Sequence, residues 1–226
     1  MLGADDVDPP YLSPGYRSTA LRAPLRPPVR VPFGPTELSA PDGALLIANR
    51  RAGADLTRQY GGEPLGERII VEGRVADARG RPLPGVLVEI WQANAAGRYA
   101  HEGDQHPAPL DPHFTGAGFC LTDGEGLYRF VTIKPGAYPW RNHPNAWRPA
   151  HVHVSVLGRA FSQRLVTQMY FPGDPLMAFD PIFQSVPAPA RERLVARFDL
   201  ERTVPEWALA YRFDVTVGGR EATPAS

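Results

Sequence analysis

Proline and glycine recur so often along this chain of 226 residues that long helices have little room; there are 26 prolines and 22 glycines. Proline removes a backbone donor and breaks helices, whereas glycine permits tight turns. Aromatic residues make up 10% of the chain, which supplies material for a hydrophobic core. The sequence therefore predicts an all-β fold of many short strands joined by turns.

Alternating and apolar stretches from residue 68 onward predict where the strands lie. Two hairpins are expected, one from residues 68–75 and 85–92 and one from residues 118–122 and 127–131. Further strands are expected at 150–157, 164–171 and 211–217, and short helices at 188–198 and 43–48. Seven or so strands joined by turns indicate a single-domain antiparallel β-sandwich with long loops and one or two short helices.

A proline-rich arm is expected over residues 1–40, ahead of a β-sandwich domain over residues 41–226. The prolines of the arm block both helix continuation and ladder hydrogen bonds. The arm also carries apolar side chains such as Tyr16, Leu25 and Phe33, which a solvated linker does not need. Two interpretations stay open: a flexible tail, or an arm laid across its own domain or a partner subunit.

Composition argues against several classes of function. Basic and acidic residues are equal in number, 24 of each, so a nucleic-acid-binding surface is not expected. No apolar run approaches the ~20 residues needed to cross a membrane, and the acidic residues 1–6 lack the apolar core of a signal peptide. Cys120 is the single cysteine, which excludes an internal disulfide and a thiolate zinc cluster. We expect a cytoplasmic protein.

The segment 150–156, Ala-His-Val-His-Val-Ser-Val, contains a histidine pair that is a candidate for metal binding. Side chains alternate between the two faces of a strand, so His151 and His153 share one face while the valines occupy the other, which must be the core. The two histidine Cα atoms then lie about 6.6 Å apart, at a rise of about 3.3 Å per residue. Two such imidazoles can converge on one metal ion, although the pattern also fits two polar residues on a solvent-facing strand.

A metal ion needs three or four protein ligands, so other donors decide between these interpretations. Cysteine is excluded by number, which leaves carboxylates, the histidines at 101, 106, 113 and 143, and tyrosines. Tyr138 lies in a segment fixed by prolines, and Tyr99 lies in a loop that Gly97 opens. Taken alone, a tyrosine in a loop is more often a half-buried aromatic residue than a metal ligand.

Several motifs together resemble the intradiol ring-cleavage dioxygenases. They are Gly97-Arg98-Tyr99, Leu121-Thr122-Asp123, and the segments 134–142 (Lys-Pro-Gly-Ala-Tyr-Pro-Trp-Arg-Asn), 147–153 (Trp-Arg-Pro-Ala-His-Val-His) and 168–175 (Gln-Met-Tyr-Phe-Pro-Gly-Asp-Pro). The resemblance runs from about Tyr16 to Val217 and is greatest to the iron-bearing beta subunits of the branch that cleaves protocatechuate. A His-x-His pair alone is common, whereas its combination with these tyrosine motifs is specific.

The resemblance implies that Tyr99, Tyr138, His151 and His153 bind a mononuclear, non-haem Fe(III). Phenolate oxygens are hard anionic donors that favour the ferric ion, and imidazoles complete such a site. Tyr138 is also implied as a catalytic proton acceptor. Arg148 matches the family arginine that stabilises negative charge as it develops on the substrate.

The resemblance further implies four substrate-binding residues: Tyr16, Trp140, Gln168 and Ile182. Tyr16 matches a family position near the substrate carboxylate. Trp140 and Ile182 are equally compatible with ordinary core positions. His106 and His143 depart from the family pattern, and we expect neither to bind the metal, because four donors are already assigned.

The implied activity is Fe(III)-dependent intradiol cleavage of protocatechuate (3,4-dihydroxybenzoate) by O2 to 3-carboxy-cis,cis-muconate, in aromatic catabolism. The implied partner is an alpha subunit, in a hetero-oligomer. One alternative is a family member that cleaves catechol or hydroxyquinol; the proline-rich start argues against it, because those relatives begin with a helical dimerisation region. The other is a non-catalytic structural subunit, against which the four retained donors argue.

Overall fold

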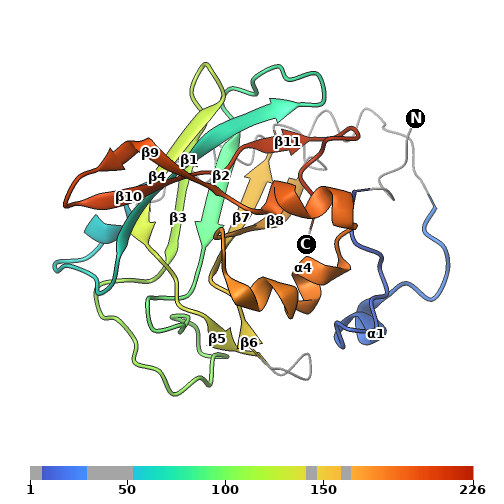
Figure 1. Ribbon diagram of the computed structural model, residues 1–226, viewed down its shortest axis with the longest axis horizontal. Coiled ribbons are helices and arrows are strands. Elements are labelled where there is room, and N and C mark those ends of the chain that lie inside the picture. The colour runs from blue at the N-terminus through green and yellow to red at the C-terminus, as the bar shows by residue number, and fades with distance from the viewer. Residues whose placement is uncertain (1–6, 30–52, 141–146, 159–163, 226) are drawn as a thin grey trace.

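The computed structural model describes residues 7–29, 53–140, 147–158 and 164–225, which form a sandwich of two main sheets (Figure 1). The first sheet contains β11 (Val215–Val217), β1 (Arg68–Asp77), β10 (Ala208–Arg212), β9 (Arg197–Val204) and β4 (Leu127–Ile133). The second runs in the order β3 (Ala117–Leu121), β2 (Leu87–Trp91), β7 (His151–Leu157) and β8 (Arg164–Tyr170). A small sheet of β5 (Tyr138–Pro139) and β6 (Trp147–Arg148) lies at one end of the sandwich. The predicted all-β sandwich is confirmed.

Strand pairing is antiparallel throughout the second sheet, and β1 also pairs antiparallel with β4. The exception is the parallel pairing of β1 with β10 and, farther along, with β11. Strand β1 can take this central place because both of its faces are covered. Ile69 and Val71 lie in the main core, while Ile70 packs with Val131 and Ala210 in a smaller cluster on the other face.

Both expected hairpins are wrong, although the strands and turns themselves form. Strands β1 and β2 lie in different sheets, and so do β3 and β4. The turns are closed locally: the Asp77 carboxylate accepts hydrogen bonds from the backbone of Arg79 and Arg81, and Asp123 does the same for Glu125 and Leu127. A closed turn fixes where the chain reverses, but burial of both strands against the opposite layer decides which sheet each strand joins.

The strand expected at 211–217 is divided into β10 and β11. Between them, the Asp214 Oδ1 atom accepts the Arg74 backbone N–H at 2.9 Å, a donor that a continuous ladder would use. The carbonyl oxygen of Phe213 instead accepts a hydrogen bond from the buried Tyr128 hydroxyl. A side-chain acceptor at one position is therefore enough to interrupt the ladder.

Helical structure is short and mostly of the 3₁₀ type. The elements are α1 (Thr19–Arg22), η2 (Leu56–Arg58), η3 (Pro175–Ala178), α4 (Pro181–Ser185) and η4 (Ala188–Leu194). The helix expected at 188–198 is therefore too long: Ala196 N donates to Tyr170 O at 2.9 Å, which draws the chain out of the helix and toward β9. The helix expected at 43–48 lies outside the described residues. None of the helices in the described ranges has the length and apolar character that a membrane crossing requires.

Two hydrophobic clusters enclose strands β7 and β8. Val152 and Val154 of β7 are fully buried in the main core between the sheets, as the alternation predicts. On the other side, Tyr170 of β8 packs with Phe183 and with residues of η4 in a second cluster. The segment 175–194 therefore covers the histidine-bearing face of β7 and β8, and a solvent-facing strand is the wrong interpretation of the two histidines.

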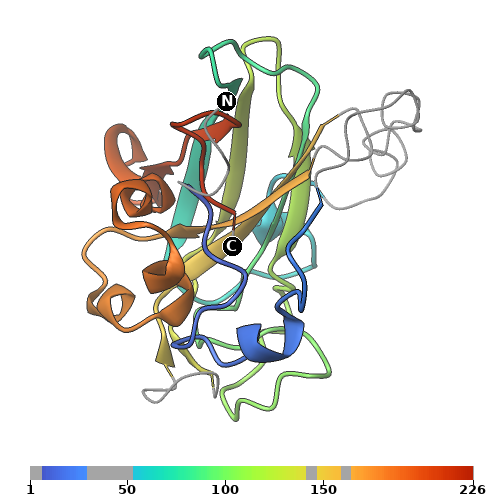
Figure 2. The same cartoon turned by 90° about the vertical axis from the view of Figure 1, so that its right-hand side faces the viewer.

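The described part of the N-terminal arm is laid across its own domain. Val7 is buried in the second cluster, beside Tyr170 and Phe183. Asp8 Oδ1 accepts a hydrogen bond from Ala225 N at 2.8 Å, and Figure 2 shows the arm beside the C-terminal end. The boundary expected at residue 40 falls outside the described residues, so the division into arm and domain stays a prediction.

Replacing Gly73 with alanine is expected to lower the free energy of unfolding by about 3 kcal/mol. A Cβ atom at this position of β1 would lie far inside van der Waals contact with the Phe213 carbonyl oxygen, a backbone atom that cannot move aside cheaply. Urea unfolding followed by circular dichroism measures the change. Gly124→Ala is the matched control, because a Cβ there meets no atom within 4 Å; equal stability of the two variants would contradict the predicted clash.

Candidate metal centre

Three short strands bring Tyr138, Arg148, His151 and His153 together. Strand β5 pairs with β6 so that Tyr138 lies opposite Arg148. Strand β7 begins three residues after Arg148, and its alternation turns both histidines away from the valine core. The four side chains are thus placed by backbone pairing, which gives a site with little conformational freedom.

The rings of the four expected ligands form one group. The His151 and His153 ring centroids are 4.9 Å apart, and the Tyr138 ring lies 5.4 Å from that of His151. The Tyr99 ring lies 5.4 Å from Tyr138 and 6.3 Å from His153. Tyr138 Oη is 3.3 Å from His151 Nε2. Residues from one loop and two strands, as distant in sequence as 99 and 153, therefore meet at one place.

Tyr99 reaches the group from a loop packed against the start of β5, where Tyr138 lies. Gly97 has a positive φ of 78°, and a Cβ there would clash with the Ala137 carbonyl group, so the close approach requires glycine. Asp104 Oδ2 then accepts the Tyr99 backbone N–H at 2.8 Å. The Tyr99 hydroxyl is buried, and no group in the described part of the chain meets it with hydrogen-bond geometry. A buried hydroxyl of this kind indicates a missing partner.

The two histidines are held in their neutral form. Burial, assisted by the positive charge of Arg148, lowers the pKa of His153 to about 3. Burial also lowers the pKa of His151 far below its ordinary value, with Arg148 and His153 contributing. His151 Nδ1 lies 2.8 Å from the Pro149 carbonyl oxygen, which favours the tautomer with hydrogen on Nδ1 and the lone pair on Nε2, the atom that faces Tyr138 and Arg148. A neutral imidazole with one free nitrogen is the form that binds metals.

The phenol of Tyr99 does not ionise by itself in this environment. Burial raises the pKa of Tyr99 far above its ordinary value, and the neighbouring Tyr138 adds to the increase. A bound cation would reverse this effect, because an ion at the site stabilises the phenolate directly. The orphaned hydroxyl and the neutral histidines are the features expected of a site that a cation completes.

The donor set itself restricts which metal fits. Within the described ranges, no three His, Cys, Asp or Glu side chains come together in a way that could hold a metal ion. The oxygen atoms of Tyr99 and Tyr138 belong to rings that lie beside His151 and His153. Two imidazole nitrogens and two hard oxygen donors suit a ferric ion rather than a soft metal such as Cu(I).

Arg148 is the centre of a buried polar network beside these rings. Its side chain is 2% exposed, and its Nη1 atom lies 3.0 Å from His151 Nε2 and 3.3 Å from Tyr138 Oη. The opposite edge of the guanidinium binds Asp180. Burial acts to lower the pKa of Arg148, but Tyr170 and the Asp180 carboxylate outweigh it and raise the pKa above its ordinary value. Arg148 therefore carries a fixed positive charge at the site.

The residues expected to bind substrate fall on two sides of Arg148. Its guanidinium carbon lies 5.2 Å from the Trp140 ring, and Tyr16 of the arm meets Trp140 edge to face at 5.2 Å. On the other side, Gln168 Oε1 accepts from Arg148 Nη2 at 2.6 Å. Ile182 is buried on α4, two residues after Asp180. The structure thus places the arm residue Tyr16 in the same neighbourhood as the strand residues.

His106 and His143 are the two histidines that were expected not to bind the metal, and the structure describes only the first. His106 lies beside Trp147, with ring centroids 6.5 Å apart, and its backbone N–H donates to Asp104 Oδ1. It is not among the rings that surround His151 and His153. His143 lies outside the described residues, so its expected non-ligand role stays a prediction.

Sequence reasoning missed three residues that shape the site. Trp91 stacks on the His153 ring at 4.8 Å with the planes 1° apart, because β2 pairs with β7 in that register. Tyr170 donates to Asp180 Oδ2 at 2.7 Å. Tyr170 shares a strand face with Gln168 and could have been found from that spacing. The strand register of Trp91 and the tertiary contact of Asp180 leave no such signal.

Comparisons with known proteins agree with this geometry. A family model described as Dioxygenase matches residues 42–219, and one described as the N-terminal part of the protocatechuate 3,4-dioxygenase beta subunit matches residues 5–33. The protocatechuate 3,4-dioxygenase beta chain of Burkholderia cepacia is 56% identical over 221 residues, which cover 96% of this chain and 92% of that protein. The alpha chain from the same organism is 31% identical over 161 residues, covering 70% of this chain and 76% of that one.

A solved structure supports the same relationship. Catechol 1,2-dioxygenase from Acinetobacter sp. ADP1 superposes with a TM-score of 0.54 at 28% identity. The match covers 77% of this chain but 62% of that chain. The family match over most of the sequence and the near full-length relative lead to one conclusion: this chain belongs to the intradiol ring-cleavage dioxygenases.

Proposed function

We propose that this chain catalyses the Fe(III)-dependent intradiol cleavage of protocatechuate by O2, giving 3-carboxy-cis,cis-muconate. The family is one that uses iron, and the Burkholderia cepacia relative of 56% identity carries protocatechuate in its name. The observation that carries the proposal is the meeting of two phenols and two neutral imidazoles beside a buried arginine. A non-catalytic structural subunit has no use for such a set of donors.

In this proposal Tyr99, Tyr138, His151 and His153 hold a mononuclear, non-haem ferric ion. The bound ion would act as a Lewis acid that binds the two ring oxygens of a catechol and favours their ionisation. Two phenolates partly neutralise its charge, so the site tolerates a trivalent ion in a buried place. The neutral imidazoles add nitrogen donors without adding charge.

Tyr138 and Arg148 are the residues to which we assign the chemistry. The Tyr138 Oη atom is suited to accept a proton from a catechol hydroxyl as the substrate binds, and Arg148 Nη1 lies 3.3 Å away from it. The same guanidinium is fixed where negative charge develops on the substrate ring. Preorganised charge of this kind lowers a barrier most effectively in a site from which water is excluded.

The substrate side of the site is assigned to Trp140, Ile182, Gln168 and Tyr16. The apolar surfaces of Trp140 and Ile182 suit the faces of an aromatic ring. Gln168 supplies a polar contact next to Arg148. Tyr16 lies under the Arg22 guanidinium, whose carbon is 4.6 Å from its ring, so positive charge near the arm is available for a ring carboxylate.

The assembly is proposed as a hetero-oligomer with an alpha chain, in the cytoplasm. The chain is similar to a beta chain and, at lower identity, to an alpha chain of the same organism. Apolar side chains of the arm lie in solvent in the single chain, including Leu21 and Leu25. Large exposed apolar groups of this kind are common at subunit contacts.

Substrate choice is tested by oxygen uptake of the purified protein, alone and co-expressed with an alpha chain. Protocatechuate is expected to be turned over at least about tenfold better than catechol in kcat/KM, because one lost charged contact is worth at least that factor. Product ultraviolet spectra distinguish a muconate from the product of cleavage outside the two hydroxyls. Equal or better turnover of catechol would assign the chain to the other branch of its family.

A further inference from the structure

A fully buried carboxylate faces the Arg148 guanidinium from the helical segment. Asp180 is 0% exposed and Arg148 is 2% exposed. Arg148 Nε donates to Asp180 Oδ1 at 3.1 Å, and Nη2 donates to Asp180 Oδ2 at 2.8 Å. Two parallel hydrogen bonds of this kind fix the plane of the guanidinium as well as its position.

The plane that Asp180 fixes directs the free edge of Arg148 toward the metal centre. With Nε and Nη2 engaged, Nη1 is left to face Tyr138 Oη at 3.3 Å and His151 Nε2 at 3.0 Å. A rotation of the guanidinium in its own plane would take Nη1 away from both atoms. The orientation toward the site therefore depends on the carboxylate behind it.

The backbone at Asp180 is itself held firmly. Asp180 is the N-cap of α4 and precedes Pro181, whose ring restricts the chain at the first helical position. Its N–H donates to Leu176 O at 3.0 Å, and its carbonyl accepts from Gln184 N at 2.9 Å. An aspartate at an N-cap ordinarily accepts a hydrogen bond from the helix backbone, yet this side chain makes no such bond. The Asp180 carboxylate accepts hydrogen bonds from Arg148 instead of from the first turn of α4.

Neighbouring groups complete the hydrogen bonding of the pair. The Tyr170 hydroxyl donates to Asp180 Oδ2 at 2.7 Å, and Gln168 Oε1 accepts from Arg148 Nη2 at 2.6 Å. The negative charge of Asp180 also offsets the positive charge of Arg148. Without Asp180, a cation bound at the adjacent ligands would repel the Arg148 guanidinium. Position and charge balance thus both depend on Asp180.

We propose that Asp180 is a positioning residue that holds the Arg148 guanidinium in the orientation needed for ring cleavage. The inference rests on the proposed function, which assigns the charge-stabilising role to Arg148. Asp180 lies behind Arg148, and its effect on turnover passes through that side chain. A purely structural ion pair would contribute to stability alone.

Asp180→Asn is the variant that tests this role. In the iron-loaded protein with protocatechuate, kcat is expected to fall about 100-fold while KM stays within about threefold. Iron content and the visible spectrum are expected to match those of the wild type. In an Arg148→Lys background the same change is expected to alter kcat by less than about threefold, because its effect depends on the guanidinium.

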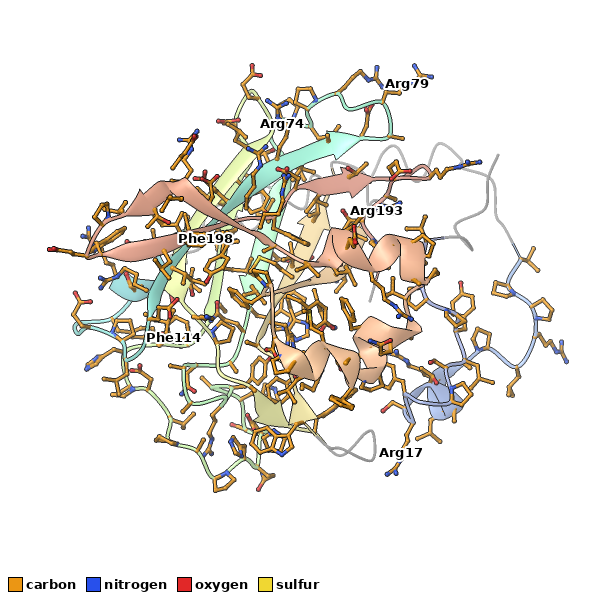
Figure 3. All side chains as sticks on the ribbon, viewed as in Figure 1. Arg17, Arg74, Arg79, Phe114, Arg193 and Phe198 are labelled. Carbon is orange, nitrogen blue, oxygen red and sulfur yellow. The ribbon has the colours of Figure 1, made fainter. Side chains whose placement is uncertain are left out.

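A readout without iron tests the contact itself. In ¹⁵N-labelled metal-free protein, the Nε–H signal that disappears in Arg148→Lys identifies Arg148. This signal is expected to exchange slowly with solvent in the wild type and quickly in Asp180→Asn. The matched control is Asp77→Asn, since Asp77 binds Arg81 through Nε at 2.7 Å in a turn far from the site. Arg79 marks this turn in Figure 3, at the end of the molecule opposite β5 and β6. The control is expected to keep wild-type kcat.

A folded Asp180→Asn protein with wild-type kcat would overturn the proposal, and so would an equal loss of kcat in both backgrounds. If Asp180→Asn yields no folded protein, Tyr170→Phe replaces it, because it removes the hydrogen bond to the Asp180 carboxylate together with the one that Arg148 Nη2 donates to the same hydroxyl at 3.1 Å. That variant is expected to lose about tenfold in kcat and to shift the Arg148 Nε–H signal, and no change in either would overturn the proposal. A wild-type protein inactive on protocatechuate would instead contradict the proposed function, while the exchange measurement would still report on Asp180.

Discussion

Replacing His151 with alanine is expected to abolish stoichiometric iron binding and, with it, oxygen consumption. His151 is 1% exposed and supplies one of two neutral nitrogen donors to the proposed site. Partners that merely orient a metal-binding histidine are worth about 10–100-fold in affinity, so removal of the ligand itself is expected to cost more than about 100-fold. Iron per chain, measured by atomic emission after dialysis, reports the effect directly.

The control for this experiment is His113→Ala, which removes a histidine outside the proposed site. His113 lies beside Gly62, and its backbone N–H donates to Asp111. It is expected to keep one iron per chain and wild-type turnover. Retention of one tightly bound iron by folded His151→Ala would contradict the proposed ligand set.

Replacing Arg148 with lysine is expected to separate iron binding from catalysis. Lysine keeps the positive charge but cannot make the forked contact with Asp180 while also facing Tyr138 and His151. Loss of one preorganised donor costs about 10²–10³ in kcat, and this is the decrease expected here. Steady-state kinetics measure it, and iron content is expected to remain at one per chain.

Arg197→Lys is the matched control for the arginine variant. Arg197 lies on β9 of the first sheet, where it forms an ion pair with Asp214 at 3.2 Å on the surface. The same chemical change there is expected to leave kcat within about twofold. If Arg148→Lys instead retained wild-type kcat with iron bound, the charge-stabilising role of Arg148 would be wrong.

Features that lie within one strand or one turn could be predicted from the sequence. The alternation of residues 151–156 placed Val152 and Val154 in the core and both histidines on the other face, as the structure shows. The turns after β1 and β3 were also predictable, because Asp77 and Asp123 accept hydrogen bonds from residues close in sequence. Information of this kind is local, and a sequence records it directly.

What could not be predicted depends on contacts between distant segments. The choice of β1 and β2 for different sheets follows from burial against the opposite layer, which no turn sequence specifies. The same holds for Asp180, 32 positions after Arg148, whose sequence context suggests only the start of a helix before Pro181. Likewise, the sequence alone left open whether the histidine face of β7 meets solvent, and only the packing of segment 175–194 over it shows that His151 is buried.

The visible spectrum of the iron-loaded protein reports whether tyrosine oxygens bind the iron. Two phenolates bound to a ferric ion are expected to give a broad charge-transfer band and a red-brown colour. Tyr99→Phe and Tyr138→Phe are each expected to shift and weaken this band in preparations of equal iron content. A colourless protein holding one ferric ion per chain, or a band unchanged in both variants, would contradict iron binding by Tyr99 and Tyr138.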